Sequence, residues 1–409
     1  MKIGIYSGEI PPPVFINNLI NGLVDKNDTV ILYGKVSERD YKFSSPAIVQ
    51  RKVPVTKLGI ILYSIYALSK LVTMQPQLYL TIVKMLRQNS TNWIQFLKSS
   101  CRVLPPFLDN LDIFHIQWAK TLVQYPEFIE KLTCPIVLSL RGTHINVSPI
   151  SDEGFSLSYK KYFPRINGFH AVSQAIAEEA EKYGADINKI TVINPAVDEK
   201  LLNYKADKVN NLDSDILHII SVGRCHWIKG YTNALDTMVI LKNKKIKFYY
   251  TIIASGKDQE NINYQINDLS LNNYVTFING LSHENIINKL LESNIFLLPS
   301  INEGISNAML EAMAIGVPVI ATDCGGISEV IEDNRNGILI PVRDSESMAE
   351  KIEYISYLEK SEIKTIINNA TETLKNNYLL KDQVDRFKLF YNMIKNKNIM
   401  YKGANNVYR

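Results

Sequence analysis

The sequence predicts an α/β protein made of two Rossmann-like domains, each a parallel sheet with helices on both faces. Apolar runs of strand length alternate with helical patterns from end to end, as in parallel sheets connected by helices. The chain has 409 residues, which is more than one hydrophobic core usually supports. A polar stretch rich in Lys, Asn and Asp interrupts the alternation at residues 199–215, where we expect a linker.

The expected strands are short runs of apolar and β-branched residues. In the first half we expect strands at Lys2–Tyr6, Thr29–Tyr33, Ala47–Val53, Ile113–Gln117, Ile136–Leu140, Phe169–Val172 and Ile190–Ile193. In the second half we expect them at Ile216–Gly223, Lys247–Ala254, Val275–Ile278, Ile295–Leu298, Val317–Ala321 and Gly337–Pro341. Helical patterns fill Ser345–Leu358, Ile363–Tyr378 and Asp382–Lys395. The domains are therefore expected at 1–198 and 216–380, followed by a terminal helix and tail at 381–409 that frays after Lys397.

The composition is that of an ordinary globular protein, with 46% hydrophobic and 21% charged residues. Its four cysteines lack the spacing of metal ligands, which fits reduced thiols in a cytosol. The N-terminus leads straight into a strand without the layout of a signal peptide. We therefore expect a cytoplasmic protein.

The segment from Tyr41 to Leu108 contains no Asp or Glu but has nine basic residues: Lys42, Arg51, Lys52, Lys57, Lys70, Lys84, Arg87, Lys98 and Arg102. Apolar runs alternate with these cations, and no run reaches the roughly 18–20 uninterrupted apolar residues of a spanning helix. A basic helical insertion at about residues 57–102 is expected to lie on an anionic membrane surface, with burial of Leu62, Tyr63, Tyr66, Leu78 and Leu80. The alternatives are an insertion that packs on its own domain and, more remotely, nucleic-acid binding.

Two glutamates seven residues apart, Glu303 and Glu311, mark the most informative segment. A strand ends at Leu298, a turn follows, and Ser306 or Asn307 can cap a helix over Asn307–Ile315. Its residues are almost all small or apolar, so a carboxylate in its middle is costly unless something pairs with it. The backbone N–H groups of residues 304–307 would favour a bound phosphate. The alternative is a solvated turn glutamate and a second glutamate paired with a structural arginine.

These residues resemble the signature of glycosyltransferase family 4, E-G-x-x-N-A-x-x-E-A-M-A, at every defined position. The resemblance implies a retaining transferase of B-type architecture, with two sheets facing across a cleft, and a nucleotide sugar as donor. It assigns Glu303 to the hydroxyls of the donor sugar and Glu311 to the ribose. The donor site would then comprise Arg224, Lys229, Glu303, Gly304, Ile305, Ser306, Asn307 and Glu311.

Arg224 and Lys229 lie in SVGRCHWIKGY, directly after a predicted strand. Ligands bind at the carboxyl ends of strands in open α/β sheets, and cations there would stabilise a departing diphosphate. The resemblance places an Arg and a Lys of this loop on the donor pyrophosphate, so no metal is implied. The motif H-W-x-K-G-Y, which begins at His226, resembles a motif of exopolysaccharide and colanic-acid transferases. A solvated Lys229 in an ordinary loop is the alternative, and the D-x-D at Asp213–Asp215 is interpreted as a solvated turn.

Further candidate side chains lie in or just after two strands of the first half. Arg141 and His144 come after Ile136–Leu140, and we expect His144 to orient the donor or shield developing positive charge. Arg141, His115 and Trp118 are candidates for the acceptor side of the cleft. For His144 and His115 the alternative is an ordinary structural histidine.

These observations predict a retaining hexosyltransferase that uses a uridine or guanosine diphosphate sugar and no cofactor. The acceptor would be lipid-linked or a polysaccharide, in bacterial capsule, O-antigen or exopolysaccharide synthesis, at the inner face of the plasma membrane and without a nucleic-acid partner. The alternatives are a nucleotide-sugar epimerase or glycan phosphorylase on the same fold, or a catalytically silent partner of a true transferase. No G-x-G-x-x-G follows the first strand, which disfavours a dehydrogenase. Ala254 replaces a glycine that the family usually has, so the base is not predicted.

Overall fold

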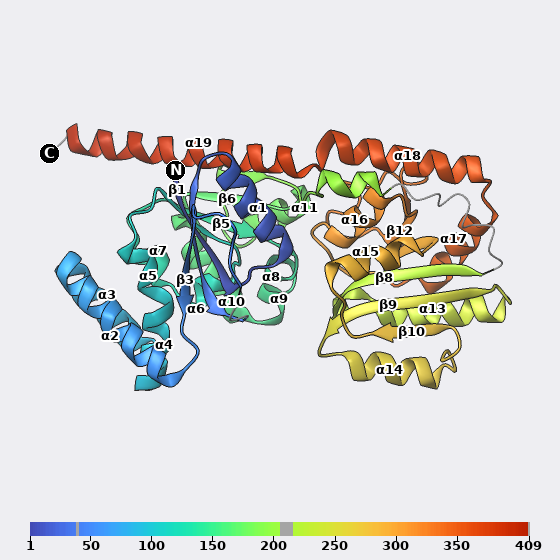
Figure 1. Cartoon of the computed structure of the whole chain (residues 1–409), viewed down its shortest axis with the longest axis horizontal. Coiled ribbons are helices and arrows are strands. Elements are labelled where there is room, and N and C mark those ends of the chain that lie inside the picture. The colour runs from blue at the N-terminus through green and yellow to red at the C-terminus, as the bar shows by residue number, and fades with distance from the viewer. Residues whose placement is uncertain (38–40, 205–215, 408–409) are drawn as a thin grey trace. The chain divides into compact units, whose positions relative to one another are not determined.

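The structure is a computed structural model that describes residues 1–37, 41–204 and 216–407, with side chains up to Lys397. The Asp213–Asp215 motif and most of the expected linker lie outside the described residues, as do the side chains of the tail. The chain divides into two compact units (Figure 1): residues 1–193 with 381–409, and residues 194–380. Both units are parallel sheets with helices, so the predicted α/β class with two Rossmann-like sheets is confirmed.

The first unit is built on a seven-stranded sheet in the order β3-β2-β1-β4-β5-β6-β7, in which all pairs are parallel. Its strands are β1 (Lys2–Ile10), β2 (Thr29–Val36), β3 (Ile48–Val53), β4 (Ile113–Ile116), β5 (Ile136–Leu140), β6 (Gly168–Ala171) and β7 (Ile190–Val192). All seven were predicted. The strand β1 runs four residues past its predicted end because it continues to pair with β2 beyond an irregularity at Gly8.

The helices of the first unit are α1 (Val14–Asp25), α2 (Lys57–Met74), α3 (Pro76–Gln88), α4 (Trp93–Val103), α5 (Pro105–Leu108), α6 (Thr121–Gln124), α7 (Glu127–Lys131), α8 (Gly142–Asn146), α9 (Ser148–Ser151), α10 (Glu153–Tyr162) and α11 (Gln174–Glu181). The basic segment thus forms α2, α3 and α4. The last helix, α19 (Leu380–Val407), packs on this unit from Lys381 onward.

The second unit carries a six-stranded parallel sheet in the order β10-β9-β8-β11-β12-β13. Its strands are β8 (Leu217–Cys225), β9 (Phe248–Gly256), β10 (Val275–Ile278), β11 (Ile295–Leu298), β12 (Val319–Thr322) and β13 (Ile338–Ile340). Its helices are α13 (Tyr231–Asn243), α14 (Gln259–Asp268), α15 (His283–Leu291), α16 (Asn307–Ile315), α17 (Ser345–Tyr357) and α18 (Lys360–Asn377). Residues just after β7 also belong to this unit, since Leu201 is buried in its core and Val197 bridges to Leu379.

Each sheet has one point at which the strand order reverses. In the first unit the chain leaves β1 for β2 on one side and returns to β4 on the other, and in the second unit the same holds for β8, β9 and β11. At such a point the loops at the carboxyl ends of neighbouring strands diverge and leave room for a ligand. Many of the candidate residues lie at or next to these two points: Lys229 follows β8, residues 303–306 follow β11, Trp118 follows β4, and Arg141 and His144 follow the neighbouring β5.

Candidate functional site

The loops that follow β8 and β11 are held against each other in the second unit. Ile301 N donates to Ile228 O at 2.7 Å. Gly230 has a φ of +66°, and a Cβ at this position would lie 1.8 Å from Pro299 O. Because such a contact is impossible, this position requires glycine. The approach brings the short helical turn Trp227–Lys229 next to the turn that carries Glu303.

Lys229 and Glu303, predicted as separate donor contacts, form an ion pair across these loops. Their side chains are only 11% and 14% exposed, and the Ser300 hydroxyl also donates to Glu303 Oε1 at 2.9 Å. Neither residue is therefore the solvated loop side chain of the alternative interpretation. At the reversal point, this cation can bind a phosphate of a ligand, and this carboxylate can accept hydrogen bonds from a hydroxyl group of the same ligand.

The N-terminus of α16 offers a row of backbone donors beside this pair. Ser306 is the N-cap, and its hydroxyl accepts from Met309 N at 3.4 Å. Within the described part of the chain, the N–H groups of residues 304–308 donate to no protein acceptor. Unpaired amides at a helix N-terminus, together with the helix dipole, favour a bound anion.

The glycine pair after β12 closes the other side of this turn. Gly325 has a φ of +56°, and a Cβ there would lie 1.8 Å from Glu303 O. Gly326 N donates to Gly304 O at 2.9 Å. These glycines thus approach the protein's own backbone closely, and this approach fixes the turn that presents Glu303.

Glu311 lies one turn into α16, with its side chain 20% exposed. Its carboxylate accepts from His283 Nε2 at 3.1 Å, and the His283 side chain is 44% exposed. This hydrogen bond raises the pKa of His283 above its usual value. The partner is therefore a half-exposed histidine at the start of α15, whereas the alternative interpretation required a structural arginine. Sequence reasoning missed His283, since it lies 28 residues from Glu311 and carries no motif.

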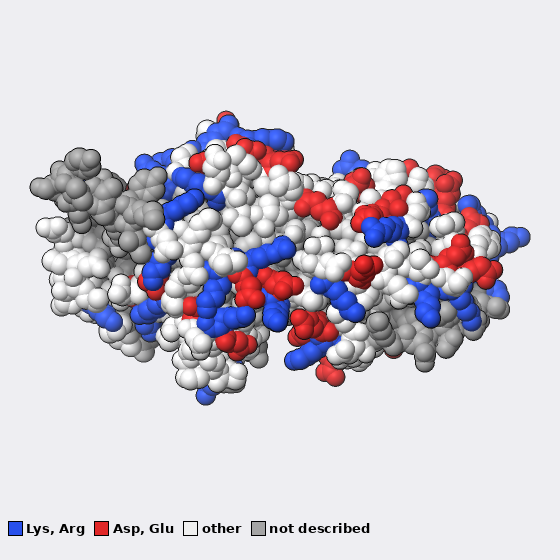
Figure 2. All heavy atoms as spheres, turned by 90° about the horizontal axis from the view of Figure 1, so that it is seen from above, with Lys and Arg blue, Asp and Glu red and all other residues white. Residues whose placement is uncertain are grey.

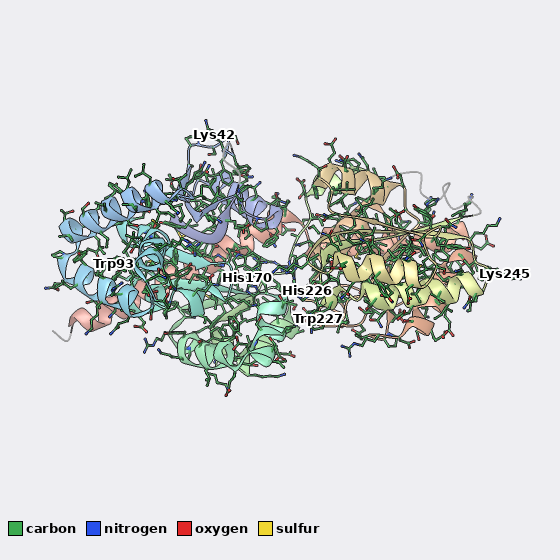
Figure 3. All side chains as sticks on the ribbon, turned by 90° about the horizontal axis from the view of Figure 1, so that it is seen from below. Lys42, Trp93, His170, His226, Trp227 and Lys245 are labelled. Atoms are coloured by element: carbon green, nitrogen blue, oxygen red, sulfur yellow. The ribbon has the colours of Figure 1, made fainter. Side chains whose placement is uncertain are left out.

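The rim of this site is formed by the end of β8 and by the loop after β9. Arg224 is exposed and forms no ion pair with any described residue, so its guanidinium is free to meet a ligand. Trp227 is 53% exposed, and its backbone N–H donates to Asp258 Oδ2 at 2.9 Å. Figure 3 shows His226 and Trp227 next to each other, with ring centroids 5.7 Å apart. Asp258, which the sequence did not single out, thereby ties the two loops together.

A second group of candidates meets at the reversal point of the first sheet. Trp118 donates its indole N–H to Ser7 O at 2.7 Å, and its ring lies 5.5 Å from that of His144. The guanidinium of Arg141 lies 4.6 Å from the ring centroid of Phe15, and Nη2 donates to Gln117 Oε1 at 3.0 Å. The structure thus brings Trp118, Arg141 and His144 together, with Phe15 and Gln117 as partners that no sequence motif indicated.

His115 does not line an acceptor cleft, and this prediction is wrong. The side chain is 0% exposed, with Nδ1 2.6 Å from Tyr391 Oη and Nε2 2.8 Å from Ser139 Oγ. Burial lowers the pKa of His115 well below its usual value. His115 belongs to β4, a central strand with every residue buried, so it is covered whichever way it points. Ser139 also contacts His170, which Figure 3 places inside the same unit.

Comparison with known proteins finds a family that matches most of the second unit. Residues 204–373 match the family described as "Glycosyl transferases group 1". The chain is 30% identical over 254 residues to the "Amylovoran biosynthesis glycosyltransferase AmsK" of Erwinia amylovora, a match that covers 60% of each chain. It is 26% identical over 227 residues to the N,N'-diacetylbacillosaminyl-diphospho-undecaprenol alpha-1,3-N-acetylgalactosaminyltransferase of Campylobacter jejuni, covering 53% of this chain and 58% of that protein. The matched segment therefore spans less than two thirds of either relative.

Solved structures share the whole fold. Sucrose-phosphate synthase from Thermosynechococcus elongatus has a TM-score of 0.72 at 15% identity, with 96% of this chain and 99% of that chain covered. Anabaena HepE in complex with UDP-glucose has a TM-score of 0.64 at 17% identity, with 94% and 98% covered. At these identities the likeness shows the fold, which is the B-type glycosyltransferase architecture.

Proposed function

Because this chain contains a glycosyl transferases group 1 domain at residues 204–373, we propose that it is a retaining hexosyltransferase that uses a nucleotide sugar. The observation that carries the proposal is the anion site at the β8/β11 reversal point. Unpaired amides of α16, Lys229 and the exposed Arg224 converge there on one edge of the sheet. That edge is where doubly wound sheets bind nucleotides.

The residues of the site suggest how the donor would be held. Its diphosphate would lie at the N-terminus of α16, with Arg224 and Lys229 stabilising the charge that develops as it departs. Glu303 would accept hydrogen bonds from sugar hydroxyls and Glu311 from the ribose. The leaving phosphate would deprotonate the acceptor on the same face of the sugar, which retains the anomeric configuration. We propose that these groups act without a metal cofactor.

A screen of nucleotide sugars tests this proposal. A ligand at a hundred times its Kd stabilises a protein by about 2.7 kcal/mol, so the true donor should raise the melting temperature by several degrees. The same donor should be hydrolysed slowly without acceptor, and the Arg224→Ala variant should lose both effects. The Lys289→Ala variant, which removes an exposed charge of the same unit, is the matched control. If no nucleotide sugar or nucleoside diphosphate stabilises the protein, the donor site is wrongly assigned.

Product analysis separates the alternatives. An epimerase would return a nucleotide sugar of changed configuration, and a phosphorylase would require phosphate and a glycan. A silent partner would bind the nucleotide without turning it over. A transferase releases nucleoside diphosphate in proportion to glycosylated acceptor.

We propose that the acceptor is lipid-linked or a polysaccharide, as in bacterial exopolysaccharide assembly. The relatives named for amylovoran biosynthesis and for a diphospho-undecaprenol substrate support this class of acceptor. Such an acceptor would bring the enzyme to the inner face of the plasma membrane, and the first unit has a surface that suits this location. We call the exposed face of α2 the apolar stripe.

The apolar stripe runs along the whole length of α2. Its members recur at helical spacing and are 42–66% exposed: Leu58, Ile61, Leu62, Ile65 and Val72. The opposite face packs into the unit through Ala67 and Leu71 together with Ser64, so α2 is largely apolar on both sides. A helix that is hydrophobic all round is normally buried, and an exposed apolar face of this length is typical of an interaction site.

Among the described residues, α2 alone is long and apolar enough to cross a bilayer, judged by length and composition. The count of uninterrupted apolar residues did not indicate this. Because Ser64 bonds to Leu97 O of α4 at 3.0 Å and the inner face of α2 packs on the core, we propose that α2 lies on the membrane.

The charges around the apolar stripe are fewer than the sequence indicates. Arg51 forms an ion pair with Asp109 at 2.6 Å, and Arg102 donates to Tyr125 Oη at 2.7 Å, so both act inside the unit. Leu78 is partly buried against the core and Tyr63 is half-buried, which removes two of the expected inserting side chains. The cations that remain on the three helices are Lys57, Lys70, Lys84, Arg87 and Lys98. On the face seen in Figure 2, blue basic side chains of this unit are interspersed with red acidic ones.

Vesicle sedimentation tests the membrane proposal. Each basic residue near an anionic surface contributes about 1 kcal/mol, and this attraction is screened by salt, whereas burial of the apolar stripe is not. We expect binding to anionic vesicles that weakens but persists as salt rises. An Ile61→Ser/Ile65→Ser variant should lose the salt-resistant part, whereas Ile150→Ser, which is 74% exposed elsewhere in the unit, should not. A protein that stays in the supernatant with anionic vesicles at low salt would refute the proposal.

A further inference from the structure

A cation in the first unit, Arg141, has no counter-ion among the described residues. Arg141 follows β5, and in the described part of the chain it forms no ion pair. Its contacts are the hydrogen bond from Nη2 to Gln117 Oε1 and the ring of Phe15. The Nε atom is buried without a hydrogen-bond partner, and Nη1 also has none among the described residues. A largely buried charge without a carboxylate is expensive, and proteins seldom keep one unless it binds something.

Arg141 gives this edge of the first sheet a positive charge. Burial lowers the pKa of its guanidinium to about 10, so it remains charged at neutral pH. The same charge contributes to the lowered pKa values of His115 and His170 beneath it. Phe15, over which the guanidinium lies, is in the first turn of α1, and this turn contains no acidic residue. The N–H groups of Val14 and Phe15 donate to no described acceptor, so the dipole of a twelve-residue helix adds to the field.

Room for a ligand lies at the same reversal point. A Cβ built on Gly8, at the end of β1, would meet nothing within 4 Å. Trp118 is hydrogen-bonded to the carbonyl of Ser7, the residue before Gly8, and its ring lies beside that of His144. The cation, the helix N-terminus and the aromatic wall therefore surround one edge of the first sheet.

We propose that Arg141 and the N-terminus of α1 bind a phosphate or diphosphate group of the acceptor. The guanidinium would donate through Nη1, and the first amides of α1 would complete the cradle. This inference rests on the proposed function for its identification of the ligand as an acceptor. The anion site at Arg141 does not depend on the proposed function, since it is separate from Arg224, Lys229 and α16. The shared chemistry has two sources, a lipid-linked diphosphate and a soluble phosphorylated compound.

Trp118 provides a reporter for this site. The chain has three tryptophans, and Trp93 and Trp227 can be replaced by phenylalanine so that Trp118 alone fluoresces. Titration of this full-length variant with inorganic pyrophosphate should give a saturable change in Trp118 emission. Arg141→Met should weaken the apparent affinity at least tenfold, because a charged hydrogen bond is lost. The affinity of Arg141→Lys should lie between those of the native residue and Arg141→Met, since lysine keeps the charge but lacks the planar guanidinium. Lys160→Met, which removes an exposed cation of the same unit, should change nothing.

A lipid diphosphate separates the two sources. Farnesyl diphosphate that binds at least tenfold more tightly than pyrophosphate would identify a lipid-linked acceptor, and equal affinities would identify a soluble one. Pyrophosphate should also raise the melting temperature of the native protein more than that of the Arg141→Met variant, and that variant should melt no lower than native without ligand. The proposal is overturned if Trp118 shows no saturable response, or if Arg141→Met and Arg141→Lys both bind normally. If Arg224→Ala loses donor binding but keeps the Trp118 response, the donor site and the Arg141 site bind independently.

Discussion

The ion pair between Lys229 and Glu303 makes Lys229→Ala the most informative single change. The substitution removes the cation and leaves the Glu303 carboxylate 14% exposed, with the Ser300 hydroxyl as its remaining described partner. Breaking a buried pair costs about 3–5 kcal/mol, because the remaining charge is stranded away from water. The residual exposure and the Ser300 hydrogen bond place this pair at the lower end, at about 3 kcal/mol. For a unit of this size, that loss lowers Tm by about 6–12 °C.

A double-mutant cycle isolates the pair. Thermal melts of Lys229→Ala, Glu303→Ala and the double variant should show that removing Glu303 as well restores most of the lost Tm, because no charge is then stranded. The pair between Lys289 and Glu292 is the control, since its side chains are 43% and 63% exposed. Lys289→Ala should cost less than 1 kcal/mol.

Nucleotide binding distinguishes stability from function in the same variants. Calorimetry should show at least tenfold weaker binding of a nucleoside diphosphate in both Lys229→Ala and the double variant, since both lack the cation. The buried ion pair is refuted as a stabilising contact if Lys229→Ala melts as Lys289→Ala does, or if the double variant is less stable than either single variant. Unchanged nucleotide affinity would remove Lys229 from the donor site while leaving its structural role intact.

Four further results are expected. Glu311→Gln should leave Tm almost unchanged, because its partner His283 is half exposed, yet weaken nucleotide binding about tenfold; a large loss of Tm with normal affinity would show a structural role. Because the pKa of His283 is raised in the folded protein, its pair with Glu311 stabilises the fold fully below about pH 6.5. This stabilisation is lost as the pH rises through the folded pKa. Urea titrations at several pH values should show this dependence in the native protein but not in Glu311→Gln. His144→Ala should reduce turnover while nucleotide affinity stays nearly intact, and equal loss of both would contradict its placement. Burial lowers the pKa of His170 to about 3, so between about pH 6.5 and pH 3 this histidine is protonated in the unfolded chain but not in the folded one. The free energy of unfolding should therefore fall as the pH is lowered through this range. His170→Gln should lack this contribution to the pH dependence.

Local features of the chain were predictable because they depend on neighbours in sequence. The strands at Ile136–Leu140, Val275–Ile278 and Ile295–Leu298 have the predicted bounds, and so does α16. Each is a compact apolar run between polar turns, and Ser306 provides the cap that begins the helix. The α2–α4 segment is helical as expected, yet its sequence does not show which cations are neutralised by partners such as Asp109.

The amino-acid pattern was sufficient for the α/β class, the strand positions and the loops that carry candidate chemistry, since short-range periodicity and turn residues specify them. Only the folded chain shows which side chains meet. Strand order places Lys229 beside Glu303 and Arg141 beside Phe15, residues that are far apart along the chain. It also puts His115 on a central strand, where the side chain is fully buried and cannot have the predicted acceptor role. The physical reason is that charge pairing and burial depend on distances in space, which sheet topology sets and local sequence does not record.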